Sequence, residues 1–214
     1  MILPSIMPLV SMSFNNIPIQ HGDPIKLVIF VAVGLTLGAL ESINWEVNIT
    51  LNSTCYIDTP EIAPCGQGNL PVYGVAVECA RDISETIKFA SSNNLRLIIK
   101  NTGHDYLGRS TGRGALSIWT HNMKNITFSS NFVPEGAKSG KGSAVTIGAG
   151  VQLADLYYAV SQQNQTVVIG YAVSVGAAGG YIQGGGHSPM GNLFGMSTDN
   201  TLEYKVVTAK VVAF

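Results

Sequence analysis

The chain has unusually few charged residues. Only 12% of its 214 residues are Asp, Glu, Lys or Arg, about half the share in an average soluble domain. The 12 basic and 13 acidic side chains give a formal net charge of −1, so no positive surplus is available to neutralise phosphates. Nucleic-acid binding by charge is therefore not expected. With 46% apolar residues, the chain is also too hydrophobic to stay disordered.

Cysteine is scarce as well, with three residues in the whole chain. Their spacings resemble no zinc site, and we expect no metal ligands. Cys55 and Cys65 lie in a proline-containing stretch, where they either form a disulfide in an oxidising compartment or stay two separate thiols. Cys79 follows the apolar alternation of an expected strand and is predicted to be a small buried side chain.

The apolar stretch near the N-terminus is short for a membrane-spanning helix. Residues 27–40 are 14 residues without a charge, whereas a span needs about 17–25. This length suits the apolar part of a secretory signal, with a short membrane anchor and a buried core segment as alternatives. We expect residues 1–40 to be a signal peptide or short anchor, and residues 41–66 to be a loop segment.

Four Asn-x-Ser/Thr triplets support secretion. They lie at Asn48, Asn52, Asn125 and Asn164, and such triplets are acceptor sites for N-glycosylation in secreted proteins. Together with the apolar stretch they predict a secreted glycoprotein. Anchoring in the membrane through residues 27–40 is the alternative.

From residue 72 the pattern becomes regular. Residues 72–77 and 95–99 are predicted strands, and the helix between them starts where the Asp82 side chain caps the backbone and Glu85 reaches back. This strand–helix–strand unit favours parallel strands. The class is mixed, α/β or α+β. Further strands are predicted at residues 115–120, 144–147, 166–169 and 202–208, and a further helix at 151–163.

A glycine-bearing loop, residues 101–110, follows the second predicted strand. Ligands bind beyond the carboxyl ends of strands in open α/β sheets, and backbone N–H groups in such a turn suit a pyrophosphate. A second run, Gly148-Ala149-Gly150, mimics a dinucleotide fingerprint, but Leu153 stands where the third glycine belongs. We therefore predict a tight strand-to-helix turn there and disfavour a nicotinamide-dependent dehydrogenase.

Glycine is concentrated in the second half of the chain. Eighteen of the 24 glycines follow residue 100, and nine lie between Gly170 and Gly195. Such density indicates either a core with many turns or a backbone that lines a ligand.

Four stretches in this order and spacing resemble a known family. They are residues 99–112 (IKNTGHDYLGRSTG), the run GAGVQLADLY, residues 175–191 (VGAAGGYIQGGGHSPMG) and residues 196–209 (MSTDNTLEYKVVTA). They are similar to the FAD-binding domain of the vanillyl-alcohol oxidase / p-cresol methylhydroxylase type, and most of all to fungal secreted oxidoreductases related to berberine bridge enzyme. The resemblance implies a two-part α+β domain over residues 67–214, with a strand–helix–strand subdomain and a mixed sheet with helices, incomplete at its C-terminus.

The resemblance also implies a cofactor site. His104 matches the position at which relatives bond a histidine nitrogen to the 8α-methyl carbon of FAD. Ala172 stands where some relatives have a second, cysteine attachment, so a single attachment is expected. His187 is expected to be a structural histidine, with a catalytic role as the alternative, and His121 is expected to be structural. The cofactor-binding residues implied are Asn101, Thr102, Gly103, His104, Asp105, Tyr106, Gly179, Gly180, Gly184, Gly185, Gly186, His187, Asp199 and Asn200.

The activity implied is that of an FAD-dependent oxidase of alcohol or sugar hydroxyls, with flavin N5 as the electron acceptor and O2 reoxidising the flavin. Relatives continue for several hundred residues, and their general base comes from that part, so no catalytic residue is assigned here. The alternative is a truncated, non-catalytic remnant whose apolar surface would otherwise be covered by a further domain.

Overall fold

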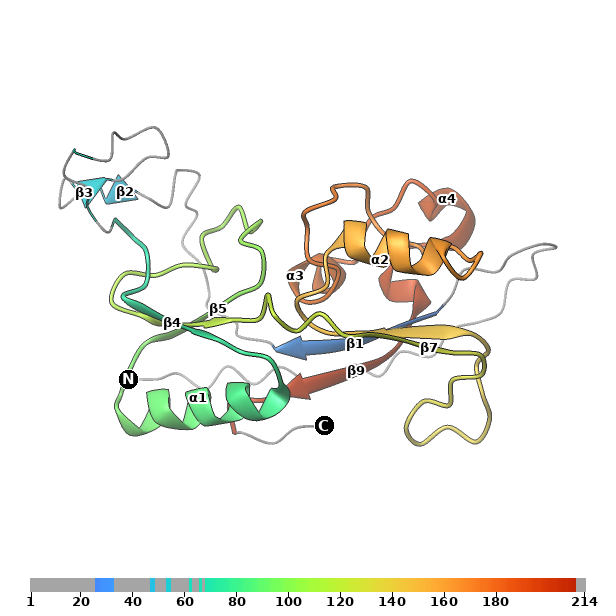
Figure 1. Cartoon of the computed structure of the whole chain (residues 1–214), viewed down its shortest axis with the longest axis horizontal. Coiled ribbons are helices and arrows are strands. Elements are labelled where there is room, and N and C mark those ends of the chain that lie inside the picture. Colours follow the sequence, from blue (N-terminus) through green and yellow to red (C-terminus); the bar gives the residue numbers. More distant parts are fainter. Residues whose placement is uncertain are drawn as a thin grey trace.

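The computed structural model describes residues 68–210 without interruption (Figure 1). Ahead of them it describes residues 62 and 66 and the backbone of three strands, β1 (Lys26–Ala32), β2 (Val47–Asn48) and β3 (Ser53–Thr54), of which β2 and β3 pair antiparallel. Cys55 and Cys65, for which the sequence leaves open a disulfide or two separate thiols, lie outside the described residues.

Three parallel strands form the first sheet, in the order β4 (Tyr73–Ala76), β6 (Leu116–Trp119), β5 (Leu97–Lys100). Helix α1 (Ala80–Ser92) connects β4 to β5 and lies against one side of the sheet (Figure 1). The predicted strand–helix–strand unit is confirmed, although β6 separates its two strands. Because the strands are parallel, the loops after β5 and β6 leave the sheet at the same edge.

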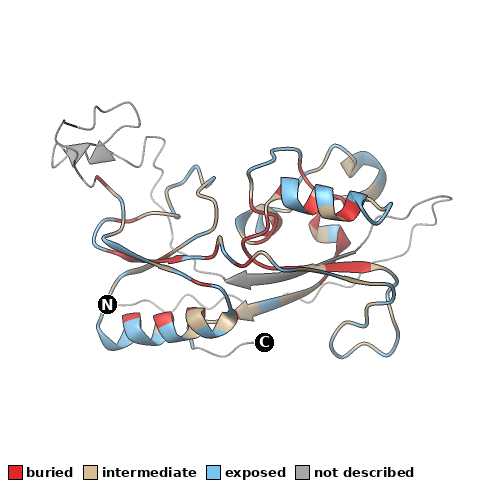
Figure 2. Cartoon of the chain, viewed as in Figure 1, coloured by how far each residue is buried: buried red, intermediate tan, exposed pale blue. Residues whose placement is uncertain are grey.

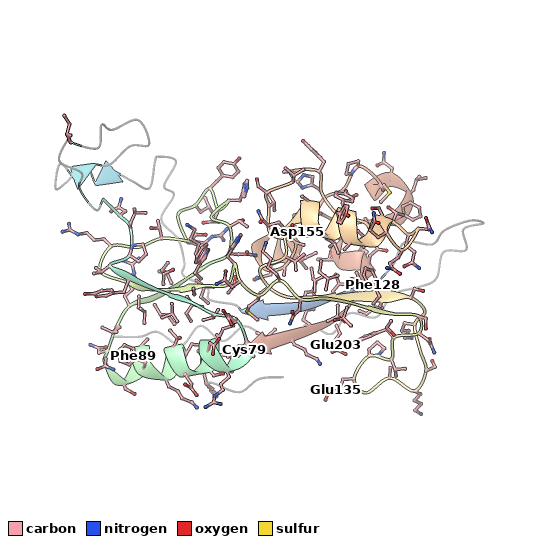
Figure 3. The ribbon with its side chains drawn as sticks, viewed as in Figure 1. Cys79, Phe89, Phe128, Glu135, Asp155 and Glu203 are labelled. Atoms are coloured by element: carbon pink, nitrogen blue, oxygen red, sulfur yellow. The ribbon has the colours of Figure 1, made fainter. Side chains whose placement is uncertain are left out.

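The start of α1 differs from the prediction. The helix begins one residue after Cys79, and the Asp82 carboxylate accepts the backbone N–H groups of Glu78 (2.9 Å) and Cys79 (3.2 Å). Asp82 thus fills the role predicted for Glu85, which pairs with Arg81 instead. Cys79 is exposed rather than buried, because the chain has already left β4 when it reaches this residue (Figure 3).

The second sheet has four strands in the order β7 (Ile126–Ser129), β8 (Ala144–Ile147), β1, β9 (Thr201–Val207). β7 is antiparallel to β8, whereas β1 is parallel to both of its neighbours. The predicted strands at residues 144–147 and 202–208 are confirmed, and β7 is a strand that the sequence pattern does not predict.

β1 comes from the apolar stretch of residues 27–40. Its backbone pairs with β8 on one side and β9 on the other, while residues 33–40 lie outside the described part of the chain. This pairing agrees with the alternative of a core segment, whereas the signal peptide and the membrane anchor stay predictions. Among the described residues, no helix has the length and hydrophobicity to cross a membrane.

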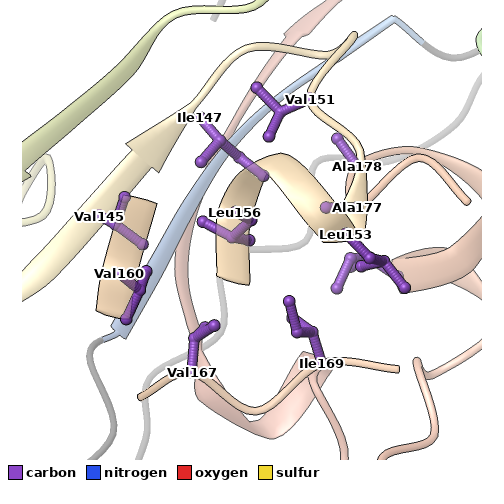
Figure 4. Packing of buried hydrophobic residues seen from close by; sticks show 11 residues of the cluster. Val145, Ile147, Val151, Leu153, Leu156, Val160, Val167, Ile169, Ala177 and Ala178 are labelled. Atoms are coloured by element: carbon purple, nitrogen blue, oxygen red, sulfur yellow. The ribbon is translucent and has the colours of Figure 1, made fainter. Parts of the chain in front are cut away.

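Helix α2 (Leu153–Ser161) packs on the second sheet and closes the larger core (Figures 1 and 4). Leu153, Leu156 and Val160 of the helix form one buried cluster with Val145 and Ile147 of β8. Burial is concentrated on the inner sides of the helices and strands (Figure 2). Each fully buried side chain of this size contributes about 1.5–3 kcal/mol of transfer free energy.

Residues 166–169 do not form the strand that their apolar run predicts. Val167, Val168 and Ile169 are buried, but the segment is irregular, and the Ile169 carbonyl accepts a hydrogen bond from the Tyr157 hydroxyl of α2 (2.9 Å). A short apolar run alone does not distinguish a strand from another buried segment. Beyond it the chain forms α3 (Gly180–Gln183), α4 (Gly191–Phe194) and the 3₁₀ turn η2 (Thr198–Asn200).

The loop after β6 packs against the turn between β8 and α2, residues 148–152. A Cβ on Gly148 would overlap the Met123 carbonyl, and one on Gly150 would overlap the His121 carbonyl. The Gly150 N–H donates to the Met123 carbonyl (2.9 Å). The run is therefore the tight strand-to-helix turn that the sequence predicts, and its glycines serve packing within the protein.

An ion pair reinforces this contact. Lys124 Nζ lies 2.9 Å from Asp155 Oδ2 and donates to Gln152 Oε1 (3.0 Å), and Asp155 also accepts the Gln152 N–H (3.2 Å). Burial on its own would raise the pKa of Asp155, but the hydrogen bonds from Lys124 and Gln152 outweigh it, so that the pKa lies below its ordinary value.

We predict that Gly150→Ala lowers the free energy of unfolding by about 2 kcal/mol or more, because backbone carbonyls have to move to admit the methyl group. Urea-induced unfolding measures the loss. Gly191→Ala is the matched control, since a Cβ there meets nothing within 4 Å. Equal stability of the two variants would contradict the close packing at Gly150.

We predict that Asp155→Asn lowers stability by about 1 kcal/mol or less near pH 7, because both partners of its ion pair are more than one-third exposed. A carboxylate with a depressed pKa stabilises the fold above its unfolded-state pKa of about 3.9, and this contribution is lost as the pH falls through the folded-state pKa. The difference from the unmodified chain should therefore shrink below about pH 4. Thermal unfolding from pH 7 down to pH 3 tests this, and a difference that grows on acidification would refute it.

Candidate functional site

The loop after β5 begins where β5 and β6 end side by side. The Thr120 N–H donates to the Lys100 carbonyl (2.9 Å), and the Trp119 indole N–H donates to the Asn101 carbonyl (3.0 Å). The His121 ring stacks on Trp119, with centroids 5.1 Å apart. The first residues of the loop are therefore held by β6, at the sheet edge where the sequence predicts a ligand.

Asn101 reaches from this loop to the second half of the molecule. Its side-chain N–H donates to the Ala149 carbonyl (2.6 Å), and a Cβ on Gly176 would overlap its amide group. Its Oδ1 atom is buried and has no hydrogen-bond partner in the described part of the chain. A buried acceptor without a donor is costly, so this oxygen suits a hydroxyl or N–H group of a bound ligand.

Lys100 lies next to the glycine turn of this loop. Gly103 has a positive φ of 89°, and the Lys100 Cε atom lies 3.2 Å from where a Cβ on this glycine would stand. An ammonium group near a turn of this kind suits an anionic ligand. Lys100 is not among the site residues predicted from the sequence, although its place directly before the loop was an available signal. Thr102 is half-buried between Asn101 and Gly103.

The Asp105 side chain forms its hydrogen bonds with Arg109 of the same loop. It accepts the backbone N–H (2.6 Å) and the guanidinium Nε–H (2.9 Å) of Arg109, and it also pairs with the Nη2 atom. Burial on its own would raise the pKa of Asp105, but the Arg109 hydrogen bonds outweigh it and lower the pKa. Asp105 therefore shapes the loop, whereas Tyr106 beside it is 86% exposed.

His104 contacts a segment 70 residues further along the chain. Its Nε2 atom lies 2.9 Å from Ser174 Oγ. Residues 172–177 line the first turn of α2, because the Leu153 and Ala154 N–H groups donate to carbonyls of this segment (2.9 and 3.0 Å). Ser174 is also missing from the predicted site residues, since nothing local in the sequence connects it to His104.

The glycines of residues 179–186 fall into two groups. Cβ atoms on Gly179 and Gly180 would meet nothing within 4 Å, and one on Gly184 would meet only nearby backbone of its own segment. Gly185 and Gly186 have positive φ angles of 96° and 69° and face the side chains of Met196 and Ser197. Backbone conformation and packing within the protein therefore already require glycine at 185 and 186. Gly179 also has a positive φ (82°), which favours glycine by itself, and the space beside Gly179 and Gly180 is open.

The remaining predicted site residues make contacts within their own segment. The His187 carbonyl accepts the Tyr181 hydroxyl (2.9 Å), and the His187 side chain is exposed. Asp199 accepts the Met196 N–H (2.8 Å). Asn200 is buried and donates to the Phe194 and Met196 carbonyls (2.9 Å each). Asp199 and Asn200 thus hold the turn before β9.

The site so assembled has the donors and acceptors that an elongated ligand with phosphates and hydroxyls requires. Lys100 offers positive charge and Asn101 Oδ1 offers a buried acceptor. Gly179 and Gly180 border open space, and they follow closely after Gly176, which packs against Asn101. His104 is an exposed imidazole on the same loop. Each of these features fits FAD, which carries a pyrophosphate, ribose and ribityl hydroxyls and a flat ring.

Comparisons with known proteins identify the domain. Residues 71–210 match the family described as the FAD binding domain. An uncharacterized FAD-linked oxidoreductase of Arthroderma benhamiae is 62% identical over 174 residues, which cover 80% of this chain and 30% of that protein. A VAO-type flavoprotein oxidase of Thermothelomyces thermophilus is 46% identical over 158 residues, which cover 74% of this chain and 27% of that one.

The fold agrees with a solved structure. The crystal structure of a VAO-type flavoprotein from Myceliophthora thermophila C1 superposes with a TM-score of 0.66 and 44% identity, covering 71% of this chain and 27% of that chain. The chain thus spans about 30% of the length of the curated relatives that it matches. The predicted two-part α+β FAD-binding fold is confirmed, and the chain belongs to the FAD-binding domain family of VAO-type flavoproteins and fungal FAD-linked oxidoreductases.

Proposed function

We propose that this chain is the FAD-binding part of an oxidoreductase that oxidises an alcohol or sugar hydroxyl, with O2 as the final acceptor. The observation that carries the FAD-binding part of the proposal is the buried, unpartnered Oδ1 atom of Asn101, which lies within the matched FAD-binding domain. The substrate class rests on the resemblance to the family. Bound FAD supplies the electron acceptor, at flavin N5. The name of the Thermothelomyces relative, an oxidase, supports O2.

The chain's own residues have two tasks in this proposal. Asn101 and Lys100 bind and orient the cofactor, with Asn101 accepting a hydroxyl or N–H hydrogen bond and Lys100 neutralising phosphate charge. His104 attaches the flavin covalently through a ring nitrogen. Ala172 has no thiol, so the attachment is single. We assign no general base to the described residues.

Exposed apolar side chains near the site support a covering group. Tyr106, Tyr171 and Val173 are 86%, 72% and 62% exposed, and they flank His104 and Ser174 in sequence. Such side chains are normally covered by a ligand, a further domain or a partner. They also favour the second candidate, a non-catalytic remnant, which would expose the same surface without binding FAD.

We also propose that the protein is secreted and glycosylated. Asn125 and Asn164 are exposed in the structure and accessible to modification. The apolar stretch of residues 27–40 would serve as the signal, with membrane anchoring as the alternative. The third alternative, a core segment of the fold, is favoured by the pairing of β1 with β8 and β9, because cleavage after residue 40 would remove this strand from the second sheet. A mass decrease on treatment with an N-glycosidase, after expression in a secreting host, would support the proposal, and an intracellular, unmodified product would refute it.

We predict that the full chain expressed with FAD retains flavin after acid precipitation. His104→Ala should lose the retained flavin, because no other side chain in the described part of the chain is proposed to attach it. In-gel flavin fluorescence measures the retention. His121→Asn is the matched control and should keep the flavin, since His121 stacks on Trp119 instead of contacting Ser174.

Two other outcomes of the acid-precipitation experiment would distinguish the remaining possibilities. Flavin lost from the unmodified chain on acid precipitation would refute covalent attachment while leaving FAD binding intact. A chain with no flavin absorbance before precipitation would favour the non-catalytic remnant.

We predict that Asn101→Ala weakens reversible FAD binding about tenfold, because it removes one hydrogen bond of about 1.4 kcal/mol. Binding is measured by flavin fluorescence titration in the His104→Ala background, in which no covalent bond forms. Asn122→Ala is the control, an exposed asparagine in the loop after β6. A change of less than twofold in the dissociation constant would refute the role of Asn101.

A further inference from the structure

The contact between His104 and Ser174 carries an inference that rests on the proposed attachment of FAD to His104. The two residues are 70 positions apart and belong to the two halves of the domain, yet His104 Nε2 lies 2.9 Å from Ser174 Oγ. A neutral imidazole has one N–H donor and one bare nitrogen, and a serine hydroxyl can accept from the first or donate to the second. Which of the two roles Ser174 takes is linked to which ring nitrogen of His104 is bare.

Ser174 is held in place by a chain of hydrogen bonds. Gln152, which precedes α2, donates from its side chain to the Ser174 carbonyl (3.0 Å). The Gln152 side-chain oxygen in turn accepts from Lys124 Nζ (3.0 Å), in the loop after β6. β5 and β6 end at the same edge of the first sheet. These hydrogen bonds therefore connect Ser174, through Gln152 and Lys124, to the edge from which the loop that carries His104 leaves the sheet. The backbone of Ser174 is therefore held by the fold, and its exposed hydroxyl meets His104 from this fixed point.

We propose that Ser174 is the positioning residue for covalent flavin attachment. Its Oγ accepts a hydrogen bond from the Nε2–H of His104, which holds the ring in one orientation and leaves Nδ1 as the bare nitrogen. A nucleophilic nitrogen needs a free lone pair. Ser174 thus selects the reactive tautomer before the cofactor is attached, without itself contacting the reacting carbon.

The attachment step balances with O2 as the oxidant. A bond forms between His104 Nδ1 and the carbon of the flavin 8-methyl group, and one C–H bond of that methyl group breaks. The imidazole gives up the hydrogen on Nε2, the one that Ser174 Oγ accepts. The C–H and N–H hydrogens leave as two protons, and these protons and the two electrons released pass to O2, which becomes hydrogen peroxide.

The test is the rate at which the full-length apo chain acquires covalent flavin after FAD is added in air. We expect Ser174→Ala to slow this rate at least tenfold and Ser174→Thr, which keeps the hydroxyl, to restore it to within about threefold of the unmodified chain. Ser91→Ala, at an exposed position on α1, is the matched control. The dissociation constant for FAD, measured in the His104→Ala background, should not change with Ser174→Ala.

A second measurement does not depend on flavin. The 15N NMR signals of His104 in the apo chain should show a bare Nδ1 and a protonated Nε2, and Ser174→Ala should shift both signals toward a mixture of the two tautomers. A merely structural role of Ser174 would leave the tautomer unchanged. A protonated Nδ1 in the unmodified chain would overturn the proposal.

The outcomes separate this inference from the proposed function. Covalent flavin that is lost in His104→Ala but forms at an unchanged rate in Ser174→Ala overturns the role of Ser174 alone. Flavin retained after acid precipitation in His104→Ala, or absent from the unmodified chain, overturns the attachment itself and this inference with it.

Discussion

The close approach of the loop after β6 to the turn of residues 148–152 is the contact on which the rest of the site depends. It is made possible by Gly148 and Gly150, where any side chain would overlap the carbonyls of that loop. Because the turn leads directly into α2, its position also places residues 172–177, which pair with the start of that helix. Without this contact Asn101 could not reach Ala149, and His104 would have no partner in the second half of the domain.

The glycine-rich second half of the chain serves two physical purposes that composition alone does not separate. Gly148, Gly150 and Gly186 are required because protein atoms occupy the space of a Cβ, whereas Gly179 and Gly180 border open space. Low charge has a related cause. The strands of the second sheet and α2 enclose a continuous aliphatic core, which has no place for charged residues. Beside the site, exposed aromatic side chains occupy surface positions at which charged side chains are more usual.

Much of the fold followed from local patterns. The strands β4, β5, β6, β8 and β9 and the helices α1 and α2 have periodic apolar residues that predict them. Residues 166–169 show where prediction from local patterns fails. A short apolar run indicates that the segment is buried, but it does not show whether its backbone pairs with a neighbouring strand. The same limit applies to the site. The loop of residues 101–106 was predicted from its place after a strand, but Ser174 and the unpartnered Asn101 oxygen depend on contacts between distant segments.

Residue order over short spans is enough to predict the family, most of the helices and strands, and the position of His104 on a glycine-bearing loop. The three-dimensional arrangement is needed to know which glycines pack against protein atoms, that Asp105 pairs with Arg109, and that Ser174 contacts His104. A hydrogen bond between residues 70 positions apart forms only when two sheets, a turn without side chains and a helix start have been assembled in one arrangement.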